Sequence, residues 1–311
     1  MAINLGLLEH FLAAYEMGSL GKAATQLGLS QPALSKSIRK LETELDVPLF
    51  HRTTKGITPT PYADTLARRS QAIQADVRSS IVELHKLKQG EVGEAKIGIA
   101  PALSPHFMPD VVARIAASHP SINITMIEAL YEGVSQAVVR GELDFALTNL
   151  PPRGVDPDLA WRELFRDRFV VCCSKAHPLA RKRKVQPAEL LGYPWITPAR
   201  KGVPWQRLVD LFVAARCAPP RAMVETNSAS VIMSLLQRGP FLTFVPRQII
   251  LFDTRRAEAV EVALEGMTLE RAIVVLHRKG HSPPKAAQLV LDACEAVATQ
   301  SGGRHPRPAT P

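Results

Sequence analysis

The stretch "LGLSQPALSKSIRKLE", residues 27–42, predicts a helix with two very different faces. Leu34, Ile38 and Leu41 recur at helical spacing, and Leu45 continues this apolar stripe. A surface helix that only has to be solvated mixes acidic with basic residues on its other face, yet no acid appears here before Glu42. The opposite face carries these polar, basic or small residues: Gln31, Pro32, Ser35, Lys36 and Arg39.

The flanking residues predict a helix-turn-helix. Ser30 is placed to cap the helix, and the residues "LGKAATQL" at 20–27 predict a shorter helix before it. Ala23 and Ala24 are small enough to let the two helices approach closely, and Gly28 begins a turn of the short length typical of this motif.

The outer face of this helix suits the major groove of DNA. Small residues let a helix enter deeply, amides and hydroxyls meet base edges, and basic groups meet guanine or phosphate. The helix N-terminus adds partial positive charge towards phosphates. The acids Glu42, Glu44 and Asp46 come only at the far end, where the contact surface is expected to stop. The alternative is an ordinary solvated helix.

Two further elements follow this helix. Arg52 and Lys55 flank a Thr-Thr-Lys-Gly turn, which predicts a basic hairpin, a wing placed for minor-groove or phosphate contact. A long helix is then expected over 61–89, and its narrow apolar seam predicts pairing with an identical helix, with packing on the protein's own body as the alternative. The seam residues are Leu66, Ile73, Val77, Ile81 and Leu84.

Residues 3–89, with the pattern "AAxxLxxSQPALSxxIxxLExxLxxxLF-R", strongly resemble the LysR-type transcriptional regulators of bacteria. Gly21 departs from the Thr or Ser common in that family, and "TPTPYA" replaces the usual entry to the long helix. The resemblance implies that Arg39 contacts the DNA backbone and that Arg52 is the wing arginine. It also implies that these residues enter the major groove: Gln31, Pro32, Ser35 and Lys36.

After a Gly-containing hinge at 89–94, β-rich runs alternate with helical stretches, which indicates a parallel α/β sheet. The order of these elements resembles the two-lobed effector domain of the same family, which shares its fold with type 2 periplasmic-binding proteins. The fold class expected is therefore α+β multidomain. The expected boundaries are 1–60 for the winged helix-turn-helix, 61–90 for the linker helix, 93–166 and 267–300 for lobe I, 167–266 for lobe II, and 301–311 for a disordered tail.

Ligands of such α/β lobes bind at the carboxyl ends of strands, where helix N-termini gather. A ring of hydroxyls with one arginine, Arg200, would suit a small anion such as a carboxylate. Ser104 is expected to cap a helix with Pro105 in its first turn, and each candidate can also be a plain cap, turn or loop residue. The candidates are Ala102, Leu103, Ser104, Thr148, Asn149, Thr197, Arg200, Asn227, Ser228, Val245 and Pro246.

Composition narrows the classes of function. The net charge of +9 makes polyanions plausible partners, and a 46% hydrophobic content is that of a globular protein. The four cysteines form no C-x-x-C pair, so neither a disulfide framework nor a metal site is expected, and no cofactor is implied. The N-terminus lacks a leader and no apolar run is long enough to cross a membrane, which predicts a cytoplasmic protein without membrane partners.

The leading interpretation is a DNA-binding regulator, not an enzyme, whose α/β domain senses a small metabolite and changes the oligomer's arrangement on DNA. Its expected partners are double-stranded promoter DNA, a small effector, a second copy of itself in a homodimer or homotetramer, and RNA polymerase. One alternative is a regulator without a ligand. Another is an enzyme or solute-binding module, although the sequence contains no Gly-rich phosphate loop, nucleophile elbow or H-E-x-x-H.

Overall fold

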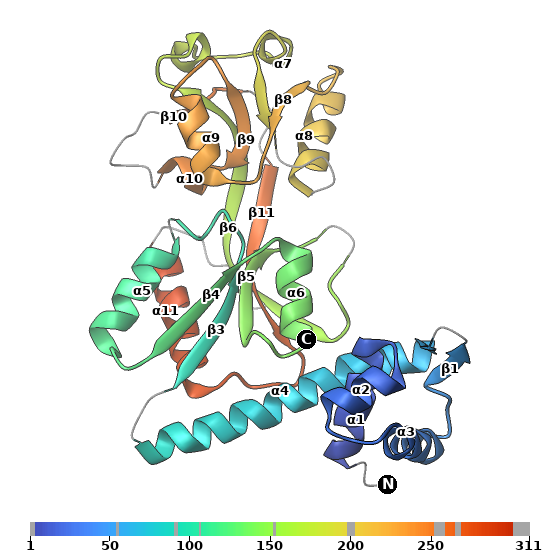
Figure 1. Ribbon diagram of the computed structural model, residues 1–311. Coiled ribbons are helices and arrows are strands. Elements are labelled where there is room, and N and C mark those ends of the chain that lie inside the picture. Colours follow the sequence, from blue (N-terminus) through green and yellow to red (C-terminus); the bar gives the residue numbers. More distant parts are fainter. Residues whose placement is uncertain are drawn as a thin grey trace. The chain divides into compact units, whose positions relative to one another are not determined.

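The computed structural model describes residues 4–53, 56–89, 93–105, 107–151, 154–197, 203–251, 259–264 and 269–300. The chain divides into two compact units (Figure 1). The first unit is Met1–Glu91 with Gln136–Leu143, and the second is Val92–Ser135 with Asp144–Pro311.

The first unit begins with three short helices whose ends follow the sequence signals. The Ser19 and Ser30 hydroxyls accept hydrogen bonds from the backbone N–H groups of Lys22 and Ala33, and Gly18 ends the first helix with φ 60°. The elements are α1 (Leu5–Met17), α2 (Leu20–Gln26), α3 (Gln31–Leu45), β1 (Phe50–Thr53), β2 (Gly56–Pro59) and α4 (Pro61–Gln89).

The apolar stripe of α3 forms the centre of this unit's core. Leu34 and Leu41 are completely buried and pack in one cluster with Phe11 of α1. Ala23 and Ala24 of α2 lie in the same cluster. The stripe and the two alanines thus have the roles that their spacing predicts, and they leave the other side of α3 free of packing duties.

The wing is an antiparallel pair of strands, β1 and β2, as predicted. The second strand starts at Gly56, whose φ of 135° is rarely adopted by residues with a side chain. Its neighbour Ile57 donates a backbone hydrogen bond of 3.1 Å to the carbonyl of Gly18. A Cβ at Gly56 would lie only 2.6 Å from that same oxygen, so glycine lets the wing dock on the α1–α2 turn.

The second unit alternates strands and helices, with a 3-10 turn at Pro178–Arg181. Its elements are β3 (Glu94–Ile99), α5 (Phe107–Ser118), β4 (Asn123–Glu128), the first part of α6 (Tyr131–Val139, which continues into the first unit from Gln136), β5 (Phe145–Asn149), β6 (Leu159–Ser174), α7 (Pro187–Leu190), β7 (Trp195–Thr197), α8 (Val203–Ala214), β8 (Ala222–Glu225), α9 (Ala229–Leu236), β9 (Leu242–Pro246), α10 (Arg247–Leu251), β10 (Ala259–Glu261), β11 (Leu269–Arg278) and α11 (Lys285–Gln300).

One mixed sheet runs through this unit in the order β4-β3-β5-β11-β6-β9-β7-β8, with β10 paired to β6. The end groups β4-β3-β5 and β9-β7-β8 are parallel, as predicted, and we call them, with their helices, lobe I and lobe II. The prediction is wrong in the middle, where β11 is antiparallel to β5 and β6, and β6 to β9. The chain crosses to lobe II along β6 and returns along β11 (Figure 1), so these strands run in opposite directions.

The crossing strand β6 is much longer than the sequence indicates. β6 starts at Leu159 and spans 16 residues, so it begins well before residue 167, the expected start of lobe II. Its first half is interrupted by charged residues, which hide the strand pattern.

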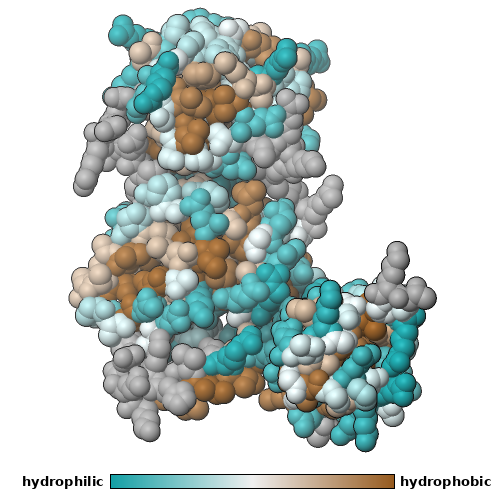
Figure 2. All heavy atoms as spheres, viewed as in Figure 1, coloured by the Kyte–Doolittle hydropathy of each residue, from teal (hydrophilic) through white to brown (hydrophobic). Residues whose placement is uncertain are grey.

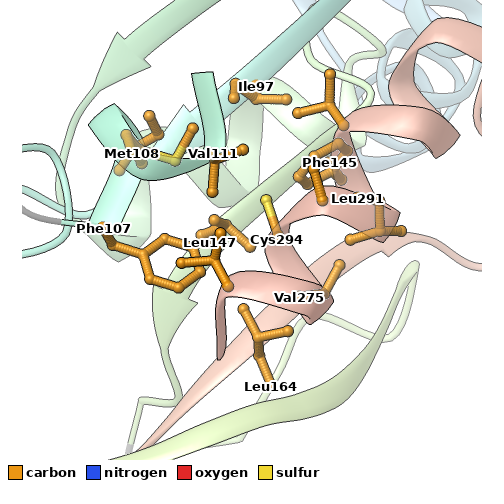
Figure 3. Close-up of a cluster of buried hydrophobic side chains, with 14 of the residues drawn as sticks. Ile97, Phe107, Met108, Val111, Phe145, Leu147, Leu164, Val275, Leu291 and Cys294 are labelled. Carbon is orange, nitrogen blue, oxygen red and sulfur yellow. The ribbon is translucent and has the colours of Figure 1, made fainter. Parts of the chain in front are cut away.

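Each lobe has its own hydrophobic core. In lobe I, α5 and α11 cover one face of the sheet, and Figure 3 shows Met108 and Val111 of α5 with Leu291 and Cys294 of α11 around strand residue Leu147. In lobe II, Trp195 of β7 packs in one cluster with Phe212 of α8. The next β7 residue, Ile196, points to the other face and packs in a second cluster with Ile232 of α9. The lobe II sheet is therefore covered by helices on both faces.

We predict that Gly56→Ala destabilises the first unit by about 2–3 kcal/mol, because the new Cβ needs both a strained φ and a shift of the Gly18 carbonyl. Urea unfolding of the full chain, followed by circular dichroism, measures this loss. Gly28→Ala is the matched control, since Gly28 also has a positive φ but a Cβ at that position would have no atom within 4 Å. Its cost should be only about 1 kcal/mol; equal losses would contradict the steric argument.

Candidate nucleic-acid interface and effector region

The outer face of α3 is accessible and cationic. Gln31, Pro32, Lys36 and Arg39 are exposed, and Ser35 is half-buried. Among the described residues neither Lys36 nor Arg39 forms an ion pair. The helix N-terminus behind Ser30 adds its partial positive charge to the same end. This face can therefore offer amide, hydroxyl and cationic groups to an anionic partner at little cost in existing contacts.

The acids at the far end of α3 have structural roles that the sequence reading did not predict. One carboxylate oxygen of Glu42 accepts hydrogen bonds from the backbone N–H groups of Leu49 and Phe50, at 2.8 and 3.2 Å. Glu44 lies 3.9 Å from Lys40. Glu42 thus fixes the start of the wing against α3. Because Leu49 and Phe50 are seven and eight residues away from Glu42, no local sequence pattern predicts this contact.

The wing is joined directly to the outer face of α3. The Arg52 guanidinium donates a hydrogen bond of 2.9 Å from Nη2 to the Ser35 hydroxyl, so two predicted DNA-contacting residues lie side by side. Because Arg52 occupies an acceptor position of that hydroxyl, the Ser35 proton remains available for a base or phosphate oxygen. The predicted wing residue Lys55 lies outside the described residues.

The long helix α4 is tied to the helix-turn-helix through α1. The Tyr15 hydroxyl donates a hydrogen bond of 2.8 Å to the Asp64 carboxylate, and this hydrogen bond, with burial, raises the pKa of Tyr15. Further along α4, Gln71 donates to Glu16 at 3.4 Å. These contacts fix the direction in which α4 leaves the domain.

The predicted seam of α4 divides into two parts. Leu66 packs against the core of the first unit, so it belongs to that core, as the alternative interpretation of the seam predicted. The remaining seam residues are exposed to between 38% and 67%, and Figure 2 shows hydrophobic residues gathered along α4. The exposed seam residues, which we call the α4 seam, are Ile73, Val77, Ile81 and Leu84.

The predicted effector residues after β3 turn out differently. Helix α5 starts at Phe107, so Ser104 is not its cap and Pro105 lies before its first turn; Pro109 fits there instead, since its missing N–H needs no partner. Leu103 is completely buried in the lobe I core. Ala102 packs against a lobe II cluster, which places this loop where the two lobes meet.

The other predicted residues lie at the carboxyl ends of strands or at a helix start. Ser228 caps α9 through Val231, Asn227 is exposed beside it, and Val245 and Pro246 are buried at the end of β9. Thr148 and Asn149 end β5 and Thr197 ends β7. Arg200 lies outside the described residues.

Three buried threonines on these strands share an unusual property. The hydroxyls of Thr148, Thr197 and Thr243 have no hydrogen-bond partner within the described part of the chain. A buried hydroxyl without a partner costs stability, so native proteins pair such groups with protein, water or ligand. Two of the three were predicted from their strand ends; Thr243 of β9 was missed because it lies inside its strand.

The sheet register brings the strand ends of the two lobes together. Asn149 at the end of β5 lies beside Ile273 of β11, which pairs with Phe165 of β6. At the end of β9, Pro246 pairs with Phe169 of β6. The carboxyl ends of both parallel groups are thus about four β6 residues apart, or roughly 13 Å along the strand.

A buried ion pair occupies this band. Asp167 of β6 and Arg271 of β11 are cross-strand partners, and Arg271 donates two hydrogen bonds to one carboxylate oxygen, at 2.8 and 3.1 Å. Burial lowers the pKa of Arg271, and the charge of Asp167 opposes that shift. No sequence signal marked these two residues, because neither follows a strand end.

Two other expectations concern metals and membranes. Cys172, Cys173 and Cys294 are buried free thiols, and burial raises the pKa of Cys173 to about 11. The described residues contain no group of three or more His, Cys, Asp or Glu arranged to hold a metal ion. They also contain no helix that is both long and apolar enough to span a membrane.

Comparison with known proteins covers almost the whole chain. Residues 5–64 match the family "Bacterial regulatory helix-turn-helix protein, lysR family", and residues 88–299 match the family "LysR substrate binding domain". The transcriptional regulator GalR of Pseudomonas putida is 28% identical over 305 residues, which cover 94% of this chain and 74% of GalR.

Solved structures show the same fold. A variant of full-length OxyR from Pseudomonas aeruginosa superposes with a TM-score of 0.67 at 20% identity, covering 99% of this chain and 100% of that one. Full-length CbnR in complex with its target DNA gives a TM-score of 0.53 at 18% identity, covering 95% of this chain and 100% of CbnR.

We predict that Glu42→Ala destabilises the first unit by about 2 kcal/mol, because two backbone N–H groups at the start of the wing lose their acceptor. Urea unfolding of the full chain measures the change. Glu9→Ala removes the same charge from an exposed position of α1 and should cost less than about 0.5 kcal/mol. A Glu42 variant as stable as the Glu9 control would show that the wing does not depend on this carboxylate.

Proposed function

Because this chain belongs to the LysR family of bacterial transcriptional regulators, we propose that the exposed face of α3 reads promoter DNA and that the second unit senses a small anionic metabolite. The observation that carries the first part is the unpaired cationic face of α3, with Lys36 and Arg39 beside a capped helix start. Family membership replaces the alternative of an enzyme, since the curated relatives are named as regulators.

The proposed contacts follow the geometry of the first unit. Gln31, Pro32, Ser35 and Lys36 enter the major groove, where amide, hydroxyl and ammonium groups meet base edges. Arg39 lies further along α3 and contacts the phosphate backbone. The wing follows the groove on the adjacent side, with Arg52 near its base.

Two chains pair through the α4 seam in this proposal. Four apolar side chains exposed on one helix lose their contact with water when they pack against the same residues of a second copy. Two recognition helices then meet half-sites about one helical turn apart or a multiple of it. The seam is compatible with a dimer and with a tetramer built from two dimers. We further propose that the assembly works in the cytoplasm and contacts RNA polymerase.

The proposed effector site lies between the lobes, at the carboxyl ends of β5, β7 and β9. The unpartnered hydroxyls of Thr148, Thr197 and Thr243 support it, because they can donate hydrogen bonds to a bound carboxylate or to its water shell. Ala102 places the loop after β3 at the same junction, and Ser228 adds the N-terminus of α9. A ligand with higher affinity for a conformation with closed lobes than for one with open lobes would shift the protein towards the closed conformation. The arrangement of the oligomer on DNA would then change.

We predict that Lys36→Ala lowers affinity for a selected DNA site about tenfold, because one base or phosphate contact is lost. The site is first obtained by selecting bound sequences from random duplex DNA with the full chain, and affinities are measured by gel shift at fixed salt. Lys40→Ala is the matched control, since Lys40 lies one turn further on α3 beside Glu44.

The control should change affinity by less than about threefold. If selection enriches no sequence, specific DNA reading by this chain is wrong. If Lys36→Ala leaves affinity and sequence preference unchanged, the assignment of the α3 face is wrong while the regulator assignment stands.

We predict that a panel of small mono- and dicarboxylates contains compounds that raise the melting temperature of the full chain saturably, by a few degrees at about 100 times Kd. The corresponding neutral amides should have no such effect. Thr197→Val should reduce the shift, because its hydroxyl is buried without a partner among the described residues. Thr125→Val on the exposed strand β4 is the control and should retain the shift.

A panel without any saturable shift would favour the alternative of a regulator whose α/β unit serves assembly only. Equal shifts in the Thr197 and Thr125 variants would move the site away from the strand ends while keeping a ligand-sensing function.

A further inference from the structure

The two lobes are connected, within the described strands, by a short two-stranded segment. Pairing of β5 with β11 ends at Ile273, opposite Phe165 of β6, and pairing of β9 with β6 begins at Phe169. Between these levels, among the described strands, β6 and β11 pair only with each other. We call β6 residues 166–168 and β11 residues 270–272 the interlobe link.

The composition of the interlobe link is unusual for the centre of a sheet. Five of its six residues are charged, in the sequences Arg-Asp-Arg and Glu-Arg-Ala, although large apolar residues occupy β6 on both sides. On one face Arg166 pairs with Glu163 and Glu270, and Arg168 with Glu261, all at partly exposed positions. Strand interiors ordinarily hold β-branched and aromatic residues, so this charge concentration calls for a physical reason.

The other face of the link holds the one deeply buried pair among these charges. The side chains of Asp167 and Arg271 are only 4% and 9% exposed. The second carboxylate oxygen of Asp167 accepts the backbone N–H of Arg168 at 2.8 Å, so the acid is held on both sides. Such a pair is a poor source of stability, because removing both charges from water costs about as much as their attraction returns.

The pair is instead placed between the cores of the two lobes. Side chains two apart on a strand share a face, so Asp167 lies between Phe165 and Phe169. Phe165 contacts Phe107 in lobe I with ring centres 5.4 Å apart, and Phe169 stacks on Phe244 in lobe II at 4.9 Å. The Arg271 guanidinium lies 5.0 Å from the Phe169 ring centre.

We propose that Asp167 and Arg271 are positioning residues that fix the twist of the interlobe link and therefore the angle between the lobes. Two-stranded ribbons twist more freely than wider sheets, so an unrestrained link would let the lobes rotate. A guanidinium fork with two hydrogen bonds to one carboxylate oxygen is directional, whereas an apolar pair in the same place would tolerate many twists. The further idea that an effector changes this angle between the lobes rests on the proposed function.

The test compares Arg271→Met, Asp167→Leu and the double variant in the full chain. Each single variant leaves a buried charge without its partner, which should lower the melting temperature by roughly 10 °C. The double variant removes both charges and should recover to within a few degrees of the parent. Arg162→Met is the matched control, because Arg162 is also a β6 arginine but pairs with Glu295 at an exposed position.

The readout that separates positioning from packing is the motion of the lobes. Spin labels at Arg114→Cys on α5 and Ala214→Cys on α8, in a Cys217→Ser background, report the interlobe distance when labelled chains are diluted with unlabelled ones. The double variant should show a broader distance distribution than the parent, and amides of the interlobe link should exchange about tenfold faster. The Arg162 control should match the parent in both.

A double variant with the parent's distance distribution and exchange rates would overturn the proposal, as would single variants with the parent's melting temperature. If the single variants fail to fold, Arg271→Lys keeps the charge but loses the fork; it should fold and still broaden the distribution, and a parental distribution in it would count against the pair. None of these measurements contains DNA or ligand. A failed carboxylate panel would therefore remove the effector proposal and leave this result interpretable.

Discussion

The antiparallel pairing of β6 with β11 is the constraint on which the second unit depends. Both parallel groups of strands are attached to this pair, one through β5 and the other through β9. Because β5 and β9 run in opposite directions along it, their carboxyl ends point to the same band of β6. The loops and helix N-termini that follow the parallel strands of both lobes therefore lie near this band of β6. A single sheet thus brings strand ends of both lobes to one band of β6.

In the first unit, α3 is held by one face while its opposite face stays exposed. Leu34, Ile38 and Leu41 attach α3 to the core, and the alanines of α2 let it approach closely. The acids that such a helix needs for solubility are moved to its end, where Glu42 also holds the wing. The outer face can then be cationic, because among the described residues Lys36 and Arg39 form no ion pair and the Ser35 hydroxyl accepts a hydrogen bond from Arg52 of the wing.

Local signals in the sequence predicted the features that lie within one element. Serine caps, Gly18 and apolar spacing gave the helices of the first unit, and the α3 face followed because spacing alone decides orientation on one helix. Features that depend on distant residues were not readable: the first half of β6 is hidden by charged residues whose partners come from α11 and β11, and the antiparallel centre of the sheet was missed with it. The strand-end rule for effector residues selected Leu103, which is buried in the lobe I core, and did not select Thr243 or the Asp167–Arg271 pair.

Polar groups of the described residues differ in how fully their hydrogen bonds are satisfied, and the buried Ser70 hydroxyl on α4 also has no partner there. Those that hold the architecture are satisfied: Glu42 accepts two N–H groups, and Asp167 accepts from both Arg271 and the backbone. The threonine hydroxyls near the strand ends have no partner within the described part of the chain. Selection for stability alone would replace such threonines by valine, which has the same shape and no orphaned hydroxyl. Hydroxyls left in this way can donate hydrogen bonds to water or to a bound ligand, which is why the proposed effector site is placed at these strands.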